Sequence, residues 1–265
     1  MILQNKNAVI FGAGGSLGGA VAKAFAAAGA HVFLTGRNME SVKKVADEII
    51  AAGGTATTAV VDGYNETEIN QHLSNMVQSA GSVDIAFNAV GVDVIQDKEL
   101  VALTQEQFVL PITQTMQTNF LTSKSVGKIM KQQKSGVILS LTATPGGISY
   151  PYTGGFAAAC AALESFSRNL ASELGVYGVR VVNIRSGGSP DSRIFKSVID
   201  AYPEIMQPVL NKMKADTMLK ELPLMADIAN TAVFLCSNLA AKITGVTIDV
   251  TSGTTAGLNY RAEEK

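Results

Sequence analysis

Cysteine and histidine are scarce in this sequence, with two residues of each type among 265. Cys160 and Cys236 are too few for a disulfide framework, and His31 and His72 do not form a cluster with metal-ligand spacing. These shortages argue against a disulfide-stabilised secreted domain and against a histidine- or cysteine-based metal site. We therefore expect a metal-free protein in the reducing cytoplasm.

The sequence also lacks a charge excess and a long apolar run. Lysine and arginine number 21 against 22 aspartates and glutamates, which leaves a net charge of −1 and no long basic or acidic block. This balance favours a small-molecule partner over nucleic acid or an anionic membrane surface. Lys23 and His31 interrupt the longest apolar stretch, well short of the roughly 18 to 20 residues that a membrane helix needs. The chain start leads directly into an apolar run, so we expect no signal peptide.

Apolar residues, by contrast, make up 47% of the chain, enough for the core of one α/β domain over residues 1–265. Short apolar runs typical of buried strands recur, with helical segments between them. The runs are Ala8–Phe11, His31–Leu34, Thr57–Val61, Val83–Asn88, Val137–Leu141, Val179–Ile184 and Val246–Val250. This alternation predicts a single-domain, Rossmann-like, doubly wound parallel sheet of about seven strands with helices on both faces.

A glycine-rich turn follows the first of these runs and leads into a helical pattern that ends at Gly29. Glycines there let the backbone approach a pyrophosphate, and the helix start offers free N–H groups and the positive end of its dipole. The arrangement predicts a dinucleotide site, although a glycine cluster can also mark only a tight turn. The predicted contacts are Gly12, Gly14, Gly15, Ser16, Leu17 and Gly18.

The second run ends in Gly36-Arg37 instead of an acidic residue. A carboxylate at this position would bind the ribose 2′-OH of NAD, whereas an arginine suits a 2′-phosphate by its charge and its planar set of donors. The sequence therefore favours NADP(H) as the cofactor. The alternative is that Arg37 only caps a solvated turn.

Ligands of such a sheet bind beyond the carboxyl ends of its strands, so the residues after each strand are candidates for the site. Asp62-Gly63 follows the third run, where an aspartate can accept from an adenine amine or act as a plain turn residue. After the fourth run, Asn88, Ala89 and Gly91 belong to a segment small enough for a ribose to lie against it.

Asn119 lies in a long predicted helix from about Gln105 to Gln133, among apolar and small residues. A buried asparagine needs hydrogen-bond partners, so it either braces the helix or contributes to a polar site. Both interpretations stay open at the level of the sequence.

Taken in order, these segments resemble the short-chain dehydrogenase/reductase family, which comprises single-domain NAD(P)-dependent oxidoreductases. The resemblance runs from about Lys6 to Gly253. Gly12, Gly14 and Gly18 lie along the family's TGxxxGxG turn, with Phe11 in place of its threonine and Ser16 in place of its middle glycine.

Five further positions or segments carry the resemblance along the chain. The segment Asn-Ala-Val-Gly at 88–91 is similar to the family's NNAG motif, Asp62 to its adenine-binding aspartate, and Asn119 to its catalytic asparagine. Residues 178–187 resemble the family strand that ends in Pro-Gly, with Ser186 for the proline and Gly187 for the cofactor-contacting glycine. Residues 243–253 resemble the closing ITGxxxxVDGG.

The chain departs from the family where catalysis is expected. The family uses a serine after the fifth strand and a YxxxK motif on the next helix, and here alignment puts Ala143, Phe156 and Cys160 at those positions, leaving only Asn119. Alanine and phenylalanine have no hydroxyl, and a neutral cysteine cannot supply a lysine's charge. Because a placed proton donor is worth about 10² to 10⁴ in rate, ordinary ketone reduction should be strongly impaired.

Substitute hydroxyls occur nearby in the sequence. Thr142 and Thr144 flank Ala143, and Tyr150 and Tyr152 precede the helix. Enoyl reductases that resemble this family place their tyrosine further ahead of the lysine, which makes Tyr152 the first candidate for a proton donor. The alternative is that both tyrosines only pack the rim of the cleft. Cys160, among alanines, fits a small buried residue better than a nucleophile.

Residues 187–224 correspond to the substrate lid of the family. Four of the seven prolines lie in this segment, and four of the nine methionines lie in or just beyond it. Flexible thioethers suit an adaptable cover over a substrate with apolar bulk, or equally a core filler. The small-residue face of Ala157–Ala162 resembles the helix through which family members pair, so we expect a homotetramer or homodimer.

Two functions compete at this stage. One is an NADP(H)-binding oxidoreductase with a rearranged active site that reduces an activated C=C or C=O bond. The other is an inactive dinucleotide-binding protein that acts as a sensor or regulatory subunit. They differ in whether any hydroxyl can reach a carbonyl placed over the nicotinamide.

Overall fold

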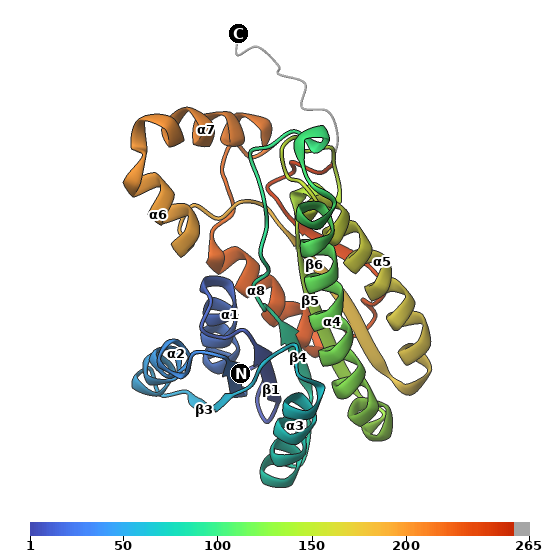
Figure 1. Cartoon of the computed structure of the whole chain (residues 1–265). Helices are drawn as coiled ribbons and strands as arrows, with labels where there is room; N and C mark the ends of the chain where they lie inside the picture. The colour runs from blue at the N-terminus through green and yellow to red at the C-terminus, as the bar shows by residue number, and fades with distance from the viewer. Residues whose placement is uncertain (257–265) are drawn as a thin grey trace.

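The computed structural model of the chain describes residues 1–256 and contains one seven-stranded parallel sheet with the order β3-β2-β1-β4-β5-β6-β7 (Figure 1). The strands are β1 (Asn7–Phe11), β2 (His31–Gly36), β3 (Thr55–Val60), β4 (Ile85–Asn88), β5 (Gly136–Ala143), β6 (Val179–Ser186) and β7 (Thr247–Val250). The predicted seven-stranded, doubly wound fold is confirmed. The predicted domain extends to residue 265, and its last nine residues lie outside the described ones.

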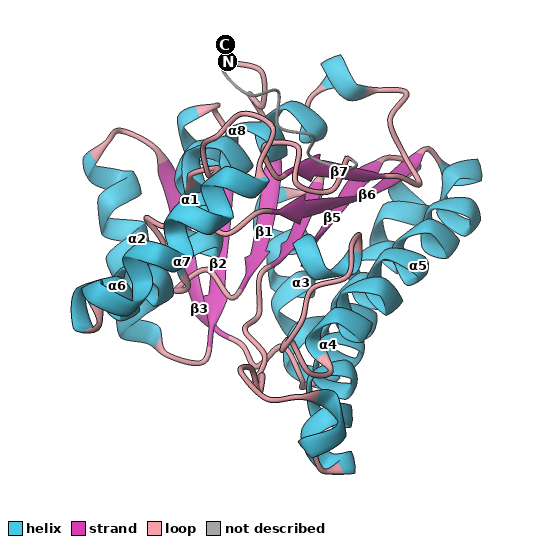
Figure 2. Cartoon of the chain, turned by 90° about the horizontal axis from the view of Figure 1, so that it is seen from above, coloured by secondary structure: helices cyan, strands magenta, loops and turns pink. Residues whose placement is uncertain are grey.

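Helices cover both faces of the sheet (Figure 2). Those on one face are α1 (Ser16–Ala27), α2 (Met39–Ala51) and α8 (Met225–Cys236), and those on the other are α3 (Glu66–Ala80), α4 (Gln105–Gln133) and α5 (Phe156–Leu174). Side chains of a strand alternate between faces, so Ala8 and Ile10 join the first core cluster while Val9 and Phe11 join the second. Strands buried on both sides explain the continuous apolar runs.

The strands β5 and β6 are longer than the apolar runs that predicted them. Their pairing continues to Ala143 opposite Ser186, beyond the last bulky apolar residue of each run. Polar residues extend these strands because backbone pairing does not depend on side-chain hydrophobicity. The two strands therefore deliver residues 143 and 186 side by side at the carboxyl edge of the sheet.

The helix α4 has the predicted bounds, Gln105–Gln133. Thr104 and Gln107 form a capping box at its start, and Lys134 ends it in the left-handed conformation. Between β6 and α8, the predicted lid segment forms two helices, α6 (Arg193–Ala201) and α7 (Pro203–Asp216). Within residues 1–256, no helix is long and apolar enough to cross a membrane.

Candidate active site

The glycine-rich turn lies between β1 and α1, where the strand order reverses. Gly12 has a φ of +79°, and a Cβ there would lie 2.5 Å from the carbonyl oxygen of Ala89. A Cβ at Gly18 would overlap the carbonyl oxygen of Gly12. Only glycine permits both approaches, so α1 starts tightly against the ends of β1 and β4. Its N-cap, Gly15, provides no side-chain hydrogen bond to the first turn of the helix.

This turn fits the phosphates of a dinucleotide. The first N–H groups of a helix have no partners within it, and here no capping side chain satisfies them. The bare backbone and the positive end of the helix dipole face the crevice at the switch between β1 and β4, where open α/β sheets bind their ligands. Gly12 to Gly18 thus surround this uncapped helix start, and their contacts with a dinucleotide stay a prediction.

Ser16 makes a contact that the sequence did not predict. Its hydroxyl oxygen accepts a hydrogen bond of 3.0 Å from the backbone N–H of Arg193, at the start of α6. Close by, the carboxylate of Asp191 accepts from the backbone N–H of Met225, at the start of α8. The first part of the lid segment, at Asp191 and Arg193, is therefore hydrogen-bonded to the starts of both α1 and α8.

Arg37 lies exposed beyond the end of β2, and its contact with a cofactor stays a prediction. Burial raises the pKa of the Tyr64 phenol, and the nearby guanidinium of Arg37 opposes that rise. Asp62 lies close to Arg37 and Tyr64. Its side chain accepts from the N–H of Tyr64 at 3.1 Å, while its own N–H donates to Glu68. Asp62 thus stabilises the turn after β3 through these two hydrogen bonds, and its contact with an adenine stays a prediction.

Gly63 and Asn88, which follow β3 and end β4, both contact α4. A Cβ at Gly63 would lie 2.9 Å from the hydroxyl oxygen of Thr118. The buried amide of Asn88 donates to Thr122 at 2.9 Å, and its oxygen accepts from the N–H of Val90 at 3.0 Å. Asn88 therefore fixes the segment that holds Ala89 and Gly91. Among residues 1–256, and apart from the adjacent residues, no atom lies within 4 Å of a Cβ placed on Gly91, which leaves open space there.

Asn119 is buried on the sheet-facing side of α4 and donates from its side-chain amide to the carbonyl oxygen of Thr115 at 2.9 Å. This bond braces α4 itself, which is one of the two roles that the sequence allowed. The bond uses one of the two hydrogens of the Asn119 amide group.

The structure brings Ala143 and Cys160, two of the three aligned catalytic positions, into contact. Ala143 ends β5, Phe156 begins α5, and Cys160 follows one turn later. Burial raises the pKa of the Cys160 thiol to about 11, although the Ala143 backbone lowers it by a hydrogen bond. The thiol is therefore neutral near pH 7 and supplies no positive charge.

The two threonines that flank Ala143 are committed to structure. Thr142 donates to Glu164 at 3.0 Å and accepts from Asn183 at 2.7 Å. Thr144 donates to the carbonyl oxygen of Ser186 at 3.3 Å. Both are buried, so neither hydroxyl hydrogen is available to a substrate without breaking a bond.

Tyr150 and Tyr152 lie on the loop between β5 and α5. These residues are 41% and 53% exposed, and Tyr152 has a φ of +61°. The carbonyl oxygen of Tyr152 accepts from the N–H of Asp97 at 2.9 Å, which ties this loop to the segment after β4. Both phenols are thus outside the core, on a loop anchored through its backbone.

An ion-pair network that the sequence analysis missed begins one helical turn beyond Cys160, with Glu164 buried, Arg185 largely buried and Asp249 at the exposed edge. Glu164 on α5 accepts two hydrogen bonds from Arg185 on β6, at 3.0 and 2.6 Å. Arg185 also donates to Asp249 on β7 at 2.8 Å. A Cβ at Gly147 would lie 2.5 Å from the guanidinium, so glycine lets the β5–α5 loop pass over it. Charges in an apolar strand and on a buried helix face are the signal that could have revealed this network.

Beyond β6, Gly187 donates from its N–H to the carbonyl oxygen of Val250 at 2.9 Å. Ser189 follows at the start of the lid segment with 4% of its surface exposed, and its hydroxyl has no hydrogen-bond partner among residues 1–256. A buried, unpartnered hydroxyl at the carboxyl end of the sheet is a further candidate for a ligand contact. No motif in the sequence singled it out.

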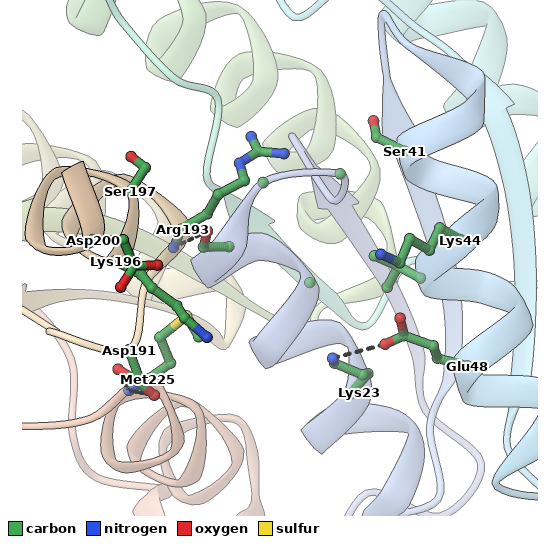
Figure 3. Close-up of a pocket in the computed structure, with 15 residues that line it drawn as sticks. Lys23, Ser41, Lys44, Glu48, Asp191, Arg193, Lys196, Ser197, Asp200 and Met225 are labelled. Carbon is green, nitrogen blue, oxygen red and sulfur yellow. Dashed lines mark hydrogen bonds and ion pairs between the residues drawn. The ribbon is translucent and has the colours of Figure 1, made fainter.

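A cleft of about 560 Å³ adjoins the glycine-rich turn (Figure 3). Its walls are the turn at Gly14, Gly15 and Ser16, the outer sides of α1 and α2, and the polar side of α6. Arg37 is not among its lining residues.

Comparison with known proteins gives three findings. A family model described as enoyl-(acyl carrier protein) reductase matches residues 12–255. The chain is 32% identical over 257 residues to 7alpha-hydroxysteroid dehydrogenase of Escherichia coli (strain K12), covering 97% of each chain. It is 28% identical over 259 residues to 2,3-dihydro-2,3-dihydroxybenzoate dehydrogenase of Bacillus subtilis (strain 168), covering 97% of this chain and 98% of that one.

The solved structure of levodione reductase superposes with a TM-score of 0.88 at 24% identity, covering 96% of this chain and 99% of that chain. This likeness confirms the fold.

Proposed function

The chain belongs to the short-chain dehydrogenase/reductase family, and from this premise we propose that it is an NADP(H)-dependent oxidoreductase whose proton donor lies outside the family's usual positions. The single observation that carries the cofactor half of the proposal is the bare glycine turn with the uncapped start of α1 at the strand switch. Arg37 supports the choice of NADP(H), since its guanidinium is exposed beyond the end of β2.

In the proposed reaction, the reduced nicotinamide supplies a hydride when it is bound. Gly12 to Gly18 hold the phosphates, Asn88 fixes the segment against the ribose, and Gly187 and Ser189 line the nicotinamide end. The hydroxyl of Ser189 lacks any partner among residues 1–256, which leaves it available to a carboxamide or a substrate oxygen.

Tyr152 is the proposed proton donor. Phe156 and Ala143 carry no hydroxyl, the thiol of Cys160 is neutral, and Thr142 and Thr144 already donate within the protein. The exposed phenol of Tyr152 lies on the loop between β5 and α5, close in sequence to Ala143 and Phe156. An activated C=C or C=O bond suits such a site, because hydride addition to it needs only that the developing oxyanion be stabilised and protonated.

The proposed substrate is a small molecule with apolar bulk, bound under the lid of residues 187–224. Met213 and Phe195 of the lid helices would contact a Cβ at Gly188, so thioether and aromatic groups lie over the end of β6. The matching family model carries an enoyl reductase description, and one relative is a steroid dehydrogenase by name. We further propose a cytoplasmic homo-oligomer, a tetramer or dimer, that pairs through Ala157–Ala162.

Titration of the protein with NADPH and NADH, followed by nicotinamide fluorescence, tests the cofactor half. We expect NADPH to bind at least about tenfold more tightly, a difference of about 1.4 kcal/mol. Arg37→Ala should remove this preference while it leaves NADH binding unchanged. Equal affinities in the wild type, or a preference that persists in Arg37→Ala, would contradict the assignment.

A catalytically inactive dinucleotide-binding protein is the second candidate. One observation favours it: every hydroxyl adjacent to Ala143 in the sequence donates within the fold, and Cys160 is buried and neutral. Such a protein would bind NADPH with the same preference and transfer no hydride. Turnover, not binding, separates the two functions.

A further inference from the structure

Two residues with strained backbone are hydrogen-bonded to each other at the carboxyl edge of the sheet. Asp97, on the loop after β4, has a φ of +64°, and Tyr152, on the loop after β5, has a φ of +61°. The N–H of Asp97 donates to the carbonyl oxygen of Tyr152 at 2.9 Å. Residues other than glycine adopt this left-handed conformation only at an energetic cost, so the surrounding contacts hold both residues in it.

The two loops interlock next to Tyr152. Gly154 has a φ of +55°, and a Cβ there would lie 2.6 Å from the carbonyl oxygen of Ile95, so only glycine lets the loops approach this closely. The hydroxyl of Thr153, a buried residue, donates to the carbonyl oxygen of Tyr150 at 3.1 Å and closes the turn that contains Tyr152. These contacts fix the chain before and after residue 152, and the bond from Asp97 fixes residue 152 itself.

The left-handed conformation suits Asp97 better than Tyr152. A short polar side chain tolerates it, whereas a bulky residue in it is an outlier. The side chain of Tyr152 does not offset this cost, because the residue is 53% exposed and its phenol forms no hydrogen bond or ring contact among residues 1–256. A large side chain held in a strained conformation without stabilising contacts indicates a functional role.

We propose that Asp97 is a positioning residue for Tyr152. Its N–H holds the carbonyl oxygen of Tyr152, and with it the backbone conformation that sets the direction of the phenol. This inference rests on the proposed function, which makes Tyr152 the proton donor. A catalytic group displaced by about 1 Å can lose about 100-fold in rate, so the bond from Asp97 matters for turnover. Asp97 acts through its main chain, and its carboxylate is not needed.

NADPH oxidation with trans-3-decen-2-one, an activated alkene, tests this role. Asp97→Pro removes the N–H and fixes φ at about −65°, so it should lower kcat about tenfold or more while NADPH affinity stays within about twofold of wild type. The conservative variants Asp97→Asn and Asp97→Gly keep the N–H and tolerate the left-handed conformation, so they should retain at least about half of the wild-type kcat. Asn5→Val is the matched control, because Asn5 is exposed, has a φ of +62° and precedes β1 at the opposite edge of the sheet. It should leave kcat unchanged.

A double variant separates positioning from a general role in loop structure. In a Tyr152→Phe background no phenol is left to position, so adding Asp97→Pro should lower the remaining kcat by less than about twofold. An unchanged kcat in Asp97→Pro, the same loss in the Tyr152→Phe background, or equal losses in Asp97→Pro and Asp97→Gly would overturn the proposal.

Urea unfolding measures the strain at residue 152 without turnover. Tyr152→Gly and Tyr152→Ala both lack the phenol, but only glycine is free of the left-handed cost, so Tyr152→Gly should unfold at a higher urea concentration than Tyr152→Ala. Equal midpoints, or a lower midpoint for Tyr152→Gly, would overturn the proposal. A wild type that does not reduce the enone, or a Tyr152→Phe variant with full activity, would instead refute the proposed function.

Discussion

Replacement of Glu164 by glutamine should destabilise the protein by about 3 kcal/mol. The carboxylate is almost fully buried, with 5% of its side chain exposed, and it accepts from Thr142 and twice from Arg185. Glutamine keeps the shape but loses the negative charge and replaces one acceptor oxygen by an amide NH2 group, which cannot accept from the guanidinium. Arg185, 13% exposed, is then left with Asp249 as its carboxylate partner, which is why we expect a loss at the lower end of the range for a broken buried pair.

Urea unfolding monitored by tyrosine fluorescence and circular dichroism measures this loss. The matched control is Glu48→Gln, which breaks the exposed pair with Lys23 and should have little measurable effect. Arg185→Met should cost a similar amount to Glu164→Gln, and the double variant should be more stable than the sum of the two losses by about 2 kcal/mol. A Glu164→Gln loss below about 1 kcal/mol, or simple additivity, would refute the idea that the network is a coupled, desolvated unit.

Three further outcomes are expected. Burial raises the pKa of the Cys160 thiol from 9.0 to about 11, so folding favours its neutral form. This preference contributes about 3 kcal/mol to the free energy of unfolding. The contribution is complete below about pH 9 and is lost as the pH rises through about 11. Urea titrations between about pH 9 and 11 should show that the free energy of unfolding declines as the pH rises, and that Cys160→Ala makes this decline smaller. A decline that is the same in Cys160→Ala would contradict this contribution of the thiol. The triple variant Ala143→Ser, Phe156→Tyr and Cys160→Lys should raise ketone reduction by orders of magnitude over wild type, and no gain would count against the alignment. Light scattering at micromolar concentration should give a dimer or tetramer through Ala157–Ala162, and a strict monomer would contradict that surface.

The fold followed from the sequence because its main signals are local. Continuous apolar runs indicated strands buried on both faces, and the glycine turn located the switch between β1 and β4. The bounds of α4 were predictable because Thr104 and Gln107 form a capping box just where the helical pattern begins. The ends of β5 and β6 were not, since polar residues continue their backbone pairing.

The site was predictable where one short motif builds it and not where distant segments meet. The turn at Gly12 to Gly18 is such a motif, whereas the contact between Ser16 and Arg193 joins residues 177 positions apart. The partners of Thr142 likewise come from α5 and β6, so the sequence could offer its hydroxyl as a substitute donor while the fold had already engaged it. Tertiary hydrogen bonds of this kind leave no periodic signal.

The proposed activity of this protein is hydride transfer with a proton donor outside the family positions. NADPH oxidation in the presence of trans-3-decen-2-one, an activated alkene with an apolar chain, tests it most directly, with 2-decanone as the unactivated match. We expect turnover of the enone well above that of the ketone. We also expect Tyr152→Phe to lower kcat about 100-fold while NADPH affinity stays unchanged. A wild type that reduces neither compound, or a Tyr152→Phe variant with full activity, would contradict a proton donor outside the family positions.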